Sequence, residues 1–191
     1  MHPGLVIVML WIAWGLSWIA AAVWTDKTEK RPALREELGY HLSVFIGFAL
    51  LIVPTHGDEG AARLWHPGRS GAWLCAALAF LGFTFTWWAR IHLGRLWSGT
   101  ITRKAGHHIV DTGPYAIVRH PIYTGLLLAV YATLVAKGTW FGIAGALFVT
   151  LGFWIKAKQE EQWLAQELGA EPYADYRRRV PMLIPFGPKP R

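Results

Sequence analysis

The chain has 191 residues, of which 53% are hydrophobic and twelve are tryptophan, and its formal net charge at pH 7 is +7. Its single cysteine excludes an internal disulfide and a thiolate metal cluster, and its eight histidines show no metal-binding pair of the HExxH kind. Because the apolar residues form long blocks, the composition indicates an integral membrane protein whose basic loops face anionic lipid; no nucleic-acid partner and no metal are expected.

The first apolar block, residues 4–24, contains no charged residue. Its length matches the ~20 residues that a helix needs to cross a hydrocarbon core about 30 Å thick. A cleaved signal peptide is the alternative, because Ala20, Ala21 and Ala22 resemble a small-residue cleavage site. Since no basic region precedes the block, and a signal core is usually only ~7–15 residues long, we expect a retained span.

Four further apolar blocks lack Lys, Arg, Asp and Glu, at residues 38–55, 71–89, 122–136 and 139–155. Together with the first block they predict an all-α integral membrane domain with about five transmembrane helices. The second, fourth and fifth blocks are short for a full crossing, so a tilted or re-entrant pair remains an alternative. Gly138 predicts a hairpin between the last two blocks.

The basic residues are distributed unevenly between the two ends of these predicted spans. Sixteen of the 19 Lys and Arg residues lie in residues 25–39, 90–121 and 156–191, whereas Arg63, Arg69 and Lys137 lie on the opposite side. Because cytoplasmic loops hold most Lys and Arg, we expect a multi-pass protein with its N-terminus outside and its C-terminus and active site in the cytosol.

The distribution of polar groups predicts one membrane-embedded domain, residues 1–191, with two functional halves. Residues 1–89 are expected to be mainly scaffold, and residues 90–191 to carry the chemistry. Trp11, Trp14 and Trp18 recur at helical spacing on one face, which favours helix or lipid packing over ligand binding.

Residues 113–125, GPYAIVRHPIYTG, place ionisable and aromatic groups directly before an apolar helix. Pro121 favours extended backbone at His120 and is itself a favoured first helical position. The free N–H groups and partial positive charge of that helix start, together with Arg119, suit an anionic ligand group such as a carboxylate. The segment therefore predicts a ligand site.

Glu160 and Glu161 follow the fifth apolar block on the same predicted side of the membrane. Carboxylates accept hydrogen bonds from an amine or from ribose hydroxyls. The alternative is a solvated helix end, in which Lys156 and Glu160 form an i,i+4 pair worth ~0.2–0.5 kcal/mol. Strong helix formers over residues 156–168 predict a helix that stops at Gly169.

Taken in order, these motifs resemble the integral-membrane S-adenosylmethionine-dependent methyltransferases, which include isoprenylcysteine carboxyl methyltransferases and phospholipid N-methyltransferases. The resemblance covers residues 107–185 and consists of HHIVDTGPYAIVRHPIYTG, a helical hairpin, the Glu160–Glu161 pair and LGAEPYADYRRRVPMLIP. It implies a cytosolic C-terminal cap of loops and short helices that binds S-adenosylmethionine. It also implies a lipid-like or small hydrophobic acceptor, of the isoprenylcysteine carboxylate or phospholipid amine type, that enters from the membrane.

The resemblance further implies a role for individual residues. Those implied to bind the cofactor are His107, His108, Ile109, Val110, Tyr115, His120, Pro121, Tyr123, Glu160 and Glu161. Catalytic roles are implied for Arg119, Lys156 and Glu160. Carboxyl methyltransferases of this kind have an arginine where this chain has Lys156, which puts a bidentate grip on an acceptor carboxylate in doubt.

Two rival functions remain open. A membrane NADPH-dependent enone or sterol-type reductase shares the RHP-x-Y element, although such reductases are longer chains than this one. A non-catalytic membrane scaffold would need no cluster of Tyr, His, Arg and Glu. The chain lacks a strand-flanked GxGxxG, so a soluble dinucleotide-binding domain is not expected. The acceptor also stays open among carboxylates, amines, thiols and isoprenoids.

Overall fold

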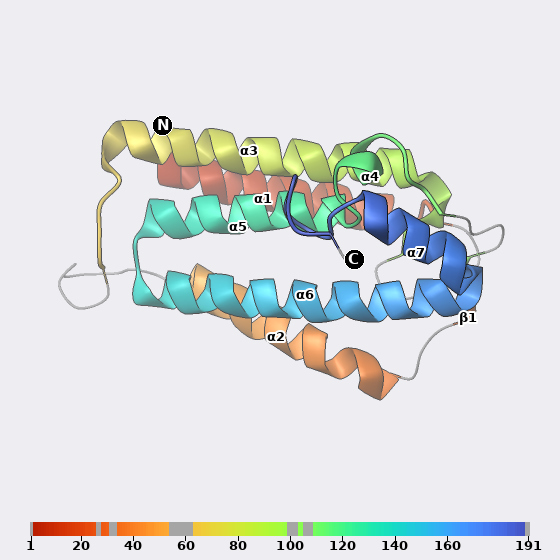
Figure 1. Cartoon of the computed structure of the whole chain (residues 1–191). Helices are drawn as coiled ribbons and strands as arrows, with labels where there is room; N and C mark the ends of the chain where they lie inside the picture. The colour runs from red at the N-terminus through yellow and green to blue at the C-terminus, as the bar shows by residue number, and fades with distance from the viewer. Residues whose placement is uncertain are drawn as a thin grey trace.

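The computed structural model describes residues 2–25, 28–30, 34–53, 63–98, 103–104 and 109–189. In this part of the chain, five long helices form a bundle and short elements gather at one end (Figure 1). The elements are α1 (Pro3–Ala21), β1 (Thr28–Lys30), α2 (Leu34–Ile52), α3 (Gly68–Leu93), the 3-10 helix η1 (Gly94–Leu96), β2 (Arg103–Lys104), α4 (Pro114–Ile117), α5 (Pro121–Lys137), α6 (Trp140–Leu168) and α7 (Ala170–Arg179).

The five long helices alternate in direction. Helices α1, α3 and α6 run one way and α2 and α5 run back, with α2 crossing α6 obliquely (Figure 1). We call the end that holds α4 and α7 the cap end, and the end that holds Gly138 the hairpin end. All three basic segments identified in the sequence begin at the cap end, as the alternation of spans requires.

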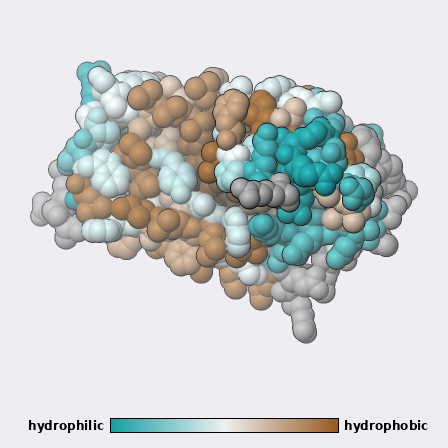
Figure 2. Space-filling model, viewed as in Figure 1, coloured by the Kyte–Doolittle hydropathy of each residue, from teal (hydrophilic) through white to brown (hydrophobic). Residues whose placement is uncertain are grey.

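Among the described residues, α1, α3 and α6 are long and apolar enough to cross a membrane. The apolar stretches of α2 (Glu37–Ile52) and α5 (Pro121–Lys137) are shorter, and the 17 residues of α5 correspond to a length of about 25 Å at 1.5 Å per residue. Figure 2 shows an apolar surface over the middle of the bundle and a hydrophilic patch at the cap end. Over the described residues the all-α fold is therefore confirmed, apart from the pairing of β1 with β2, and three of its helices could cross a membrane; a crossing by all five stays a prediction.

Glycines allow the two closest helix pairs to meet at backbone distance. A Cβ atom built on Gly82 of α3 would lie 2.5 Å from the carbonyl oxygen of Gly125 on α5. A Cβ atom on Gly145 of α6 would lie 2.7 Å from the carbonyl oxygen of Gly47 on α2. Small residues at such crossings give van der Waals contact between helices in a membrane, where no hydrophobic force acts between them.

The tryptophan face of α1 packs against α3 and α5, which confirms the packing interpretation. The indole N–H of Trp14 donates to Thr86 Oγ1 (2.9 Å), and that of Trp11 donates to Thr133 Oγ1 (3.0 Å). Trp18 stacks on Trp14 with 5.0 Å between ring centroids. The indoles of Trp11 and Trp14 therefore contribute apolar area together with a satisfied donor.

The predicted hairpin is present, but the fifth span is longer than expected. Helix α5 ends at Gly138, which is left-handed (φ 63°), and Thr139 caps α6 by accepting a hydrogen bond from the Gly142 N–H (3.0 Å). Helix α6 then continues for 29 residues to Leu168, where Gly169 (φ 103°) ends it. The expectation of a short fifth span was wrong because the charged residues after 155 extend the same helix.

Arg90 is fully buried at the cap end of α3, although its side chain is charged. Its guanidinium donates to the carbonyl oxygens of Ala21 (3.0 Å), Trp24 (2.6 Å) and Gly94 (2.6 Å). The same group lies 4.8 Å and 4.5 Å from the ring centroids of Trp24 and Trp97. Arg90 thus provides donors for the free carbonyls that follow α1 and joins α1 to α3.

Substitution of Arg90 by methionine is expected to lower the thermal midpoint of unfolding. Each carbonyl oxygen left buried without a donor costs ~1–3 kcal/mol. Arg90→Lys, which retains the charge but loses the planar fork, should fall between the wild type and Arg90→Met. Tryptophan fluorescence of the detergent-purified protein measures the midpoint, and an unchanged midpoint in Arg90→Met would contradict this role.

Candidate active site

The segment before α5 follows a path that one glycine makes possible. Gly113 has φ 56°, and a Cβ atom there would lie 2.7 Å from the His92 ring. The turn leads into the four-residue helix α4 and buries Tyr115, whose carbonyl oxygen accepts a hydrogen bond from the Tyr176 hydroxyl (2.8 Å). The predicted Gly-Pro turn therefore anchors the loop to α7.

The C-terminal segment lies alongside this loop and holds it in place. The backbone N–H groups of Arg119 and His120 donate to the carbonyl oxygens of Pro181 (2.9 Å) and Met182 (3.1 Å). One turn into α5, the hydroxyl of Thr124 donates to the Leu183 carbonyl oxygen (2.6 Å). The loop motif and the closing motif, which are far apart in the sequence, thus form one structural unit.

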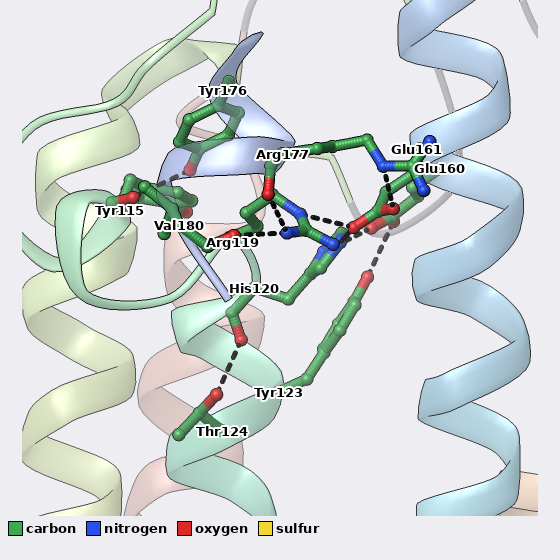
Figure 3. A network of polar contacts seen from close by, with 10 residues as sticks. All are labelled: Tyr115, Arg119, His120, Tyr123, Thr124, Glu160, Glu161, Tyr176, Arg177 and Val180. Atoms are coloured by element: carbon green, nitrogen blue, oxygen red, sulfur yellow. Dashed lines mark hydrogen bonds and ion pairs between the residues drawn. The ribbon is translucent and has the colours of Figure 1, made fainter. Parts of the chain in front are cut away.

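Glu161 is the buried centre of a charged cluster (Figure 3). Its Oε1 accepts a hydrogen bond from Arg119 Nε (2.7 Å) and lies 3.3 Å from His120 Nε2, while its Oε2 lies 3.4 Å from Arg177 Nε. The Arg119 guanidinium also donates to the carbonyl oxygens of Arg177 and Val180. These contacts join α6 to the loop before α5 and to α7.

Glu160 faces a different set of partners from its neighbour. Its Oε1 accepts a hydrogen bond from the Tyr123 hydroxyl (2.6 Å) and lies 4.0 Å from Lys156 Nζ. Its Oε2 lies 3.4 Å from His120 Nδ1. The Glu160 side chain is 19% exposed, against 3% for Glu161, so Glu160 is the carboxylate more accessible to a ligand.

His120 connects the two carboxylates. Burial lowers its pKa, but its hydrogen bonds to Glu160 and Glu161 outweigh burial, and the pKa stands above the usual value for histidine. A charged imidazole donates from both ring nitrogens, which matches one contact to each carboxylate. Burial also raises the pKa of the Tyr115 hydroxyl, which therefore stays protonated.

The first half of the chain contributes two residues that the sequence analysis did not assign to the site. Glu37 and Tyr40 on α2 are both buried, at 6% and 2% exposure. Lys156 Nζ lies 5.2 Å from the centroid of the Tyr40 ring and 5.5 Å from that of Tyr123. The one available signal was an acid and a tyrosine three residues apart at the start of an apolar block, positions that share a helix face.

The structure brings most of the predicted site residues together. The cluster at the cap end holds Tyr115, Arg119, His120, Pro121, Tyr123, Lys156, Glu160 and Glu161. Ile109 packs against the buried Tyr173 and Tyr176, and Val110 beside it is partly buried. His107 and His108 lie outside the described residues.

Arg119 differs from the expectation that its guanidinium faces a ligand anion. Its side chain is 3% exposed, and its donors contact Glu161 and two backbone carbonyls. This arrangement favours a positioning role, in which Arg119 fixes Glu161 and the segment that follows α7. Arg177, the partner of Glu161 from α7, was not among the predicted residues and is signalled only by the basic triplet at 177–179.

The raised pKa of His120 predicts a pH dependence of stability. A group whose pKa is higher in the folded state stabilises fully below its unfolded value, ~6.5 for histidine, and loses this contribution as the pH rises through the folded value. The wild type should therefore lose its stability advantage over His120→Asn as the pH increases from 6 to 9. Thermal unfolding of both proteins across this range measures the difference, and a constant difference would contradict the assignment.

Comparison with known proteins agrees with this geometry. Residues 75–166, from the first turns of α3 to near the end of α6, match the model of the isoprenylcysteine carboxyl methyltransferase family. The chain is 31% identical over 146 residues to protein-S-isoprenylcysteine O-methyltransferase B of Arabidopsis thaliana, covering 73% of this chain and 74% of that protein.

Two bacterial relatives are named for a different acceptor. The chain is 30% identical over 174 residues to a methanethiol S-methyltransferase of Pseudomonas sp., covering 81% of this chain and 61% of that protein. It is 44% identical over 73 residues to methanethiol S-methyltransferase 2 of Bradyrhizobium diazoefficiens, covering 37% of this chain and 26% of that protein. The chain thus spans about a quarter to three fifths of the length of these two relatives. On the match to the plant enzyme over most of both chains, this protein belongs to the isoprenylcysteine carboxyl methyltransferase family of membrane methyltransferases.

Proposed function

We propose that the protein transfers a methyl group from S-adenosylmethionine to a hydrophobic acceptor whose reacting atom is a thiolate or carboxylate. The observation that carries the proposal is the charged cluster around His120, Glu160 and Glu161 at one end of an apolar bundle, in a chain of this family. A polar cap on apolar helices suits a water-soluble donor and an acceptor that arrives from lipid.

The residues at the cap end fit such a donor. A carboxylate has about four acceptor positions, and the partly exposed Glu160 uses one for the Tyr123 hydroxyl and faces His120 with its other oxygen. Glu160 therefore has acceptor positions left for hydrogen bonds from an amine or from ribose hydroxyls. Ile109 and Val110 would supply apolar and backbone contacts for a ring. When bound, S-adenosylmethionine supplies a methyl group activated by a positively charged sulfur.

The charge of the cluster supports an anionic acceptor. Four cationic groups, on Arg119, Arg177, Lys156 and a charged His120, face the carboxylates of Glu160 and Glu161 and the buried Glu37 of α2. The small excess of positive charge stabilises an anionic group and disfavours a protonated phospholipid amine. The Lys156 ammonium group is a compact point charge, whereas an arginine at this position would present a planar pair of donors that matches the two oxygens of a carboxylate. A single reacting atom such as a thiolate therefore suits Lys156 at least as well as a carboxylate does. Positioning and exclusion of water then dominate the catalysis.

The proposed topology has five spans. The alternating helices would put the N-terminus and the hairpin end outside, and the cap end in the cytosol, where the donor would be available. Within this single domain, residues 90–191 would carry the donor site and the first three spans would form the scaffold. Glu37 and Tyr40 are the exception, because α2 would bring them to the acceptor side of Lys156.

Calorimetric titration of the detergent-purified protein with S-adenosylhomocysteine tests the donor, with NADPH titrated in parallel. We expect micromolar binding of S-adenosylhomocysteine and none of NADPH. Binding of NADPH alone would support the rival reductase, and binding of neither would favour the scaffold.

Transfer of a labelled methyl group then tests the acceptor. A small thiol and a prenylated cysteine represent the two acceptor classes named in the relatives, and a phosphatidylethanolamine vesicle represents the amine class. Label in the thiol or carboxylate product supports the proposal. Label only in the phospholipid would refute an anionic acceptor while leaving the methyltransferase activity standing.

A further inference from the structure

The segment that follows α7 is apolar and lies between basic residues. Residues 181–188, PMLIPFGP, contain no charged residue, whereas three arginines at 177–179 precede them and Lys189 follows. Figure 1 shows that this segment folds back over α5 instead of leaving the cap end of the bundle. We call residues 181–187 the apolar turn. They lie outside residues 75–166, so the match to the family model does not account for them.

The backbone of the apolar turn has protein partners. The carbonyl oxygens of residues 181–184 each accept a hydrogen bond, in order from the Arg119 N–H, the His120 N–H, the Thr124 hydroxyl and the Gly187 N–H. Its prolines carry no N–H group that would need a partner. Irregular backbone is tolerated at the level of a membrane only where its polar groups are satisfied by the protein or by water. These four carbonyl groups therefore meet that condition.

The contact with α5 gives the depth of the apolar turn in the bundle. Thr124, whose hydroxyl donates to it, precedes Gly125, and a Cβ atom built on Gly125 would lie 2.8 Å from the Thr86 side chain of α3. Thr86 belongs to residues 71–89, the part of α3 that contains no charged residue. The first charge towards the cap end is Arg90, one turn further on. The apolar turn thus meets α5 at the level where the uncharged part of α3 ends.

Two large apolar side chains of the apolar turn point away from the rest of the protein. Ile184 is 67% exposed and Phe186 is 99% exposed. Among the residues that the structure describes, Phe186 is also the one residue other than glycine with positive φ (61°). It occupies the third position of a β-turn closed by the hydrogen bond from Gly187 to Ile184, where positive φ favours glycine or asparagine. An apolar medium around the ring would account for a phenylalanine at this strained position.

We infer that the apolar turn is an interfacial membrane anchor, in which the Ile184 and Phe186 side chains enter the lipid at the cap end. The bilayer is the occupant because the apolar turn continues an exposed apolar face of α5. Leu128 and Tyr131 lie four and seven residues after Thr124, on the same face of that helix, and are 39% and 40% exposed.

The anchor ties the cap to the membrane surface. The carbonyl oxygens of the apolar turn hold the backbone of Arg119 and His120, so insertion fixes the depth of the loop before α5. The arginines at 177–179 and Lys189 stay in the polar region on either side, which limits the insertion to the interface. The inference is independent of the proposed methyl transfer, since it concerns contact with lipid alone.

Quenching by labelled lipid tests the inference in the full chain, reconstituted in phosphatidylcholine nanodiscs. The fluorophore NBD is attached to Phe186→Cys in a Cys75→Ala background, because Cys75 is the single native cysteine. Some of the lipid carries a doxyl group on its acyl chain and quenches a probe that reaches the apolar region. Phe80→Cys, 56% exposed on α3, is the matched lipid-facing control, and Glu171→Cys, 86% exposed on α7, is the aqueous control.

We expect the probe at position 186 to show blue-shifted emission and to lose fluorescence to doxyl lipid as the probe at position 80 does. Ile184→Cys retains Phe186 and the turn, so it gives a second reading in case Phe186→Cys does not fold, and it should be quenched as well. Quenching at neither position, with emission like that at position 171, overturns the inference. Blue-shifted emission that doxyl lipid does not quench also overturns it, because a protein surface would then cover the apolar turn.

Discussion

Replacement of Glu161 by alanine is expected to lower the free energy of unfolding by ~3–5 kcal/mol, the cost of removing one partner from a buried ion pair. The Arg119 side chain is 3% exposed and would be left charged, without the carboxylate that lies 2.7 Å from its Nε. His120 and Arg177 would each lose one carboxylate contact as well. Thermal unfolding of the purified protein measures the loss.

Two variants show whether burial causes this effect. Glu161→Gln keeps an oxygen that accepts from Arg119, so its loss should be smaller than that of Glu161→Ala. Glu171→Ala, on α7, removes a carboxylate that is 86% exposed and should change stability little, because surface pairs contribute only ~0–1 kcal/mol. Equal losses in Glu161→Ala and Glu171→Ala would show that the cluster does not stabilise the cap.

Replacement of Glu160 by glutamine is expected to weaken S-adenosylhomocysteine binding by about ten- to a hundredfold. Hydrogen bonds to a charged group contribute ~1.5–3 kcal/mol, and ~1.4 kcal/mol corresponds to a factor of ten. The substitution removes the charge of the more exposed carboxylate while keeping its shape and its contact with Tyr123. Calorimetric titration measures the dissociation constant, and this prediction rests on the proposed function.

The comparison of Glu160→Gln with Glu161→Gln distinguishes ligand binding from support of the cap. Glu160→Gln should affect affinity more than stability, and Glu161→Gln should affect stability more than affinity. Glu171→Gln is the matched exposed control and should leave both unchanged. Wild-type affinity in Glu160→Gln would refute the assignment of Glu160 to the donor site.

The two carboxylates are adjacent in the sequence but have different surroundings. Glu161 points into the protein and holds three segments together, whereas Glu160 faces Tyr123 and Lys156 near the second helix. His120 contacts both, so its protonation couples the stability of the cap to the charge of the site. A ligand at Glu160 would therefore bind next to a group that also stabilises the folded cap.

Local chemistry in the sequence was sufficient to predict the membrane helices and several of their ends. Pro121 starts α5 because its missing N–H costs nothing at the first position of a helix, and Gly138 ends the same helix because glycine adopts positive φ without strain. Gly169 likewise ends α6. These features depend on a residue and its near neighbours, which the sequence displays directly. The motifs of the family also identified most of the residues in the cluster.

Only the tertiary structure decided which groups are partners, because hydrophobic periodicity gives the buried face of a helix but not the helix that covers it. Arg119 and Glu161 are 42 residues apart, and nothing local indicates that they meet. Glu37 and Tyr40 reach the site because glycine contacts bring α2 against α6. Arg90 resembled a cytosolic loop charge, yet it is buried against the carbonyls that follow α1. In each case the contact depends on packing between segments that lie far apart in the sequence, and local sequence patterns do not reveal which segments meet.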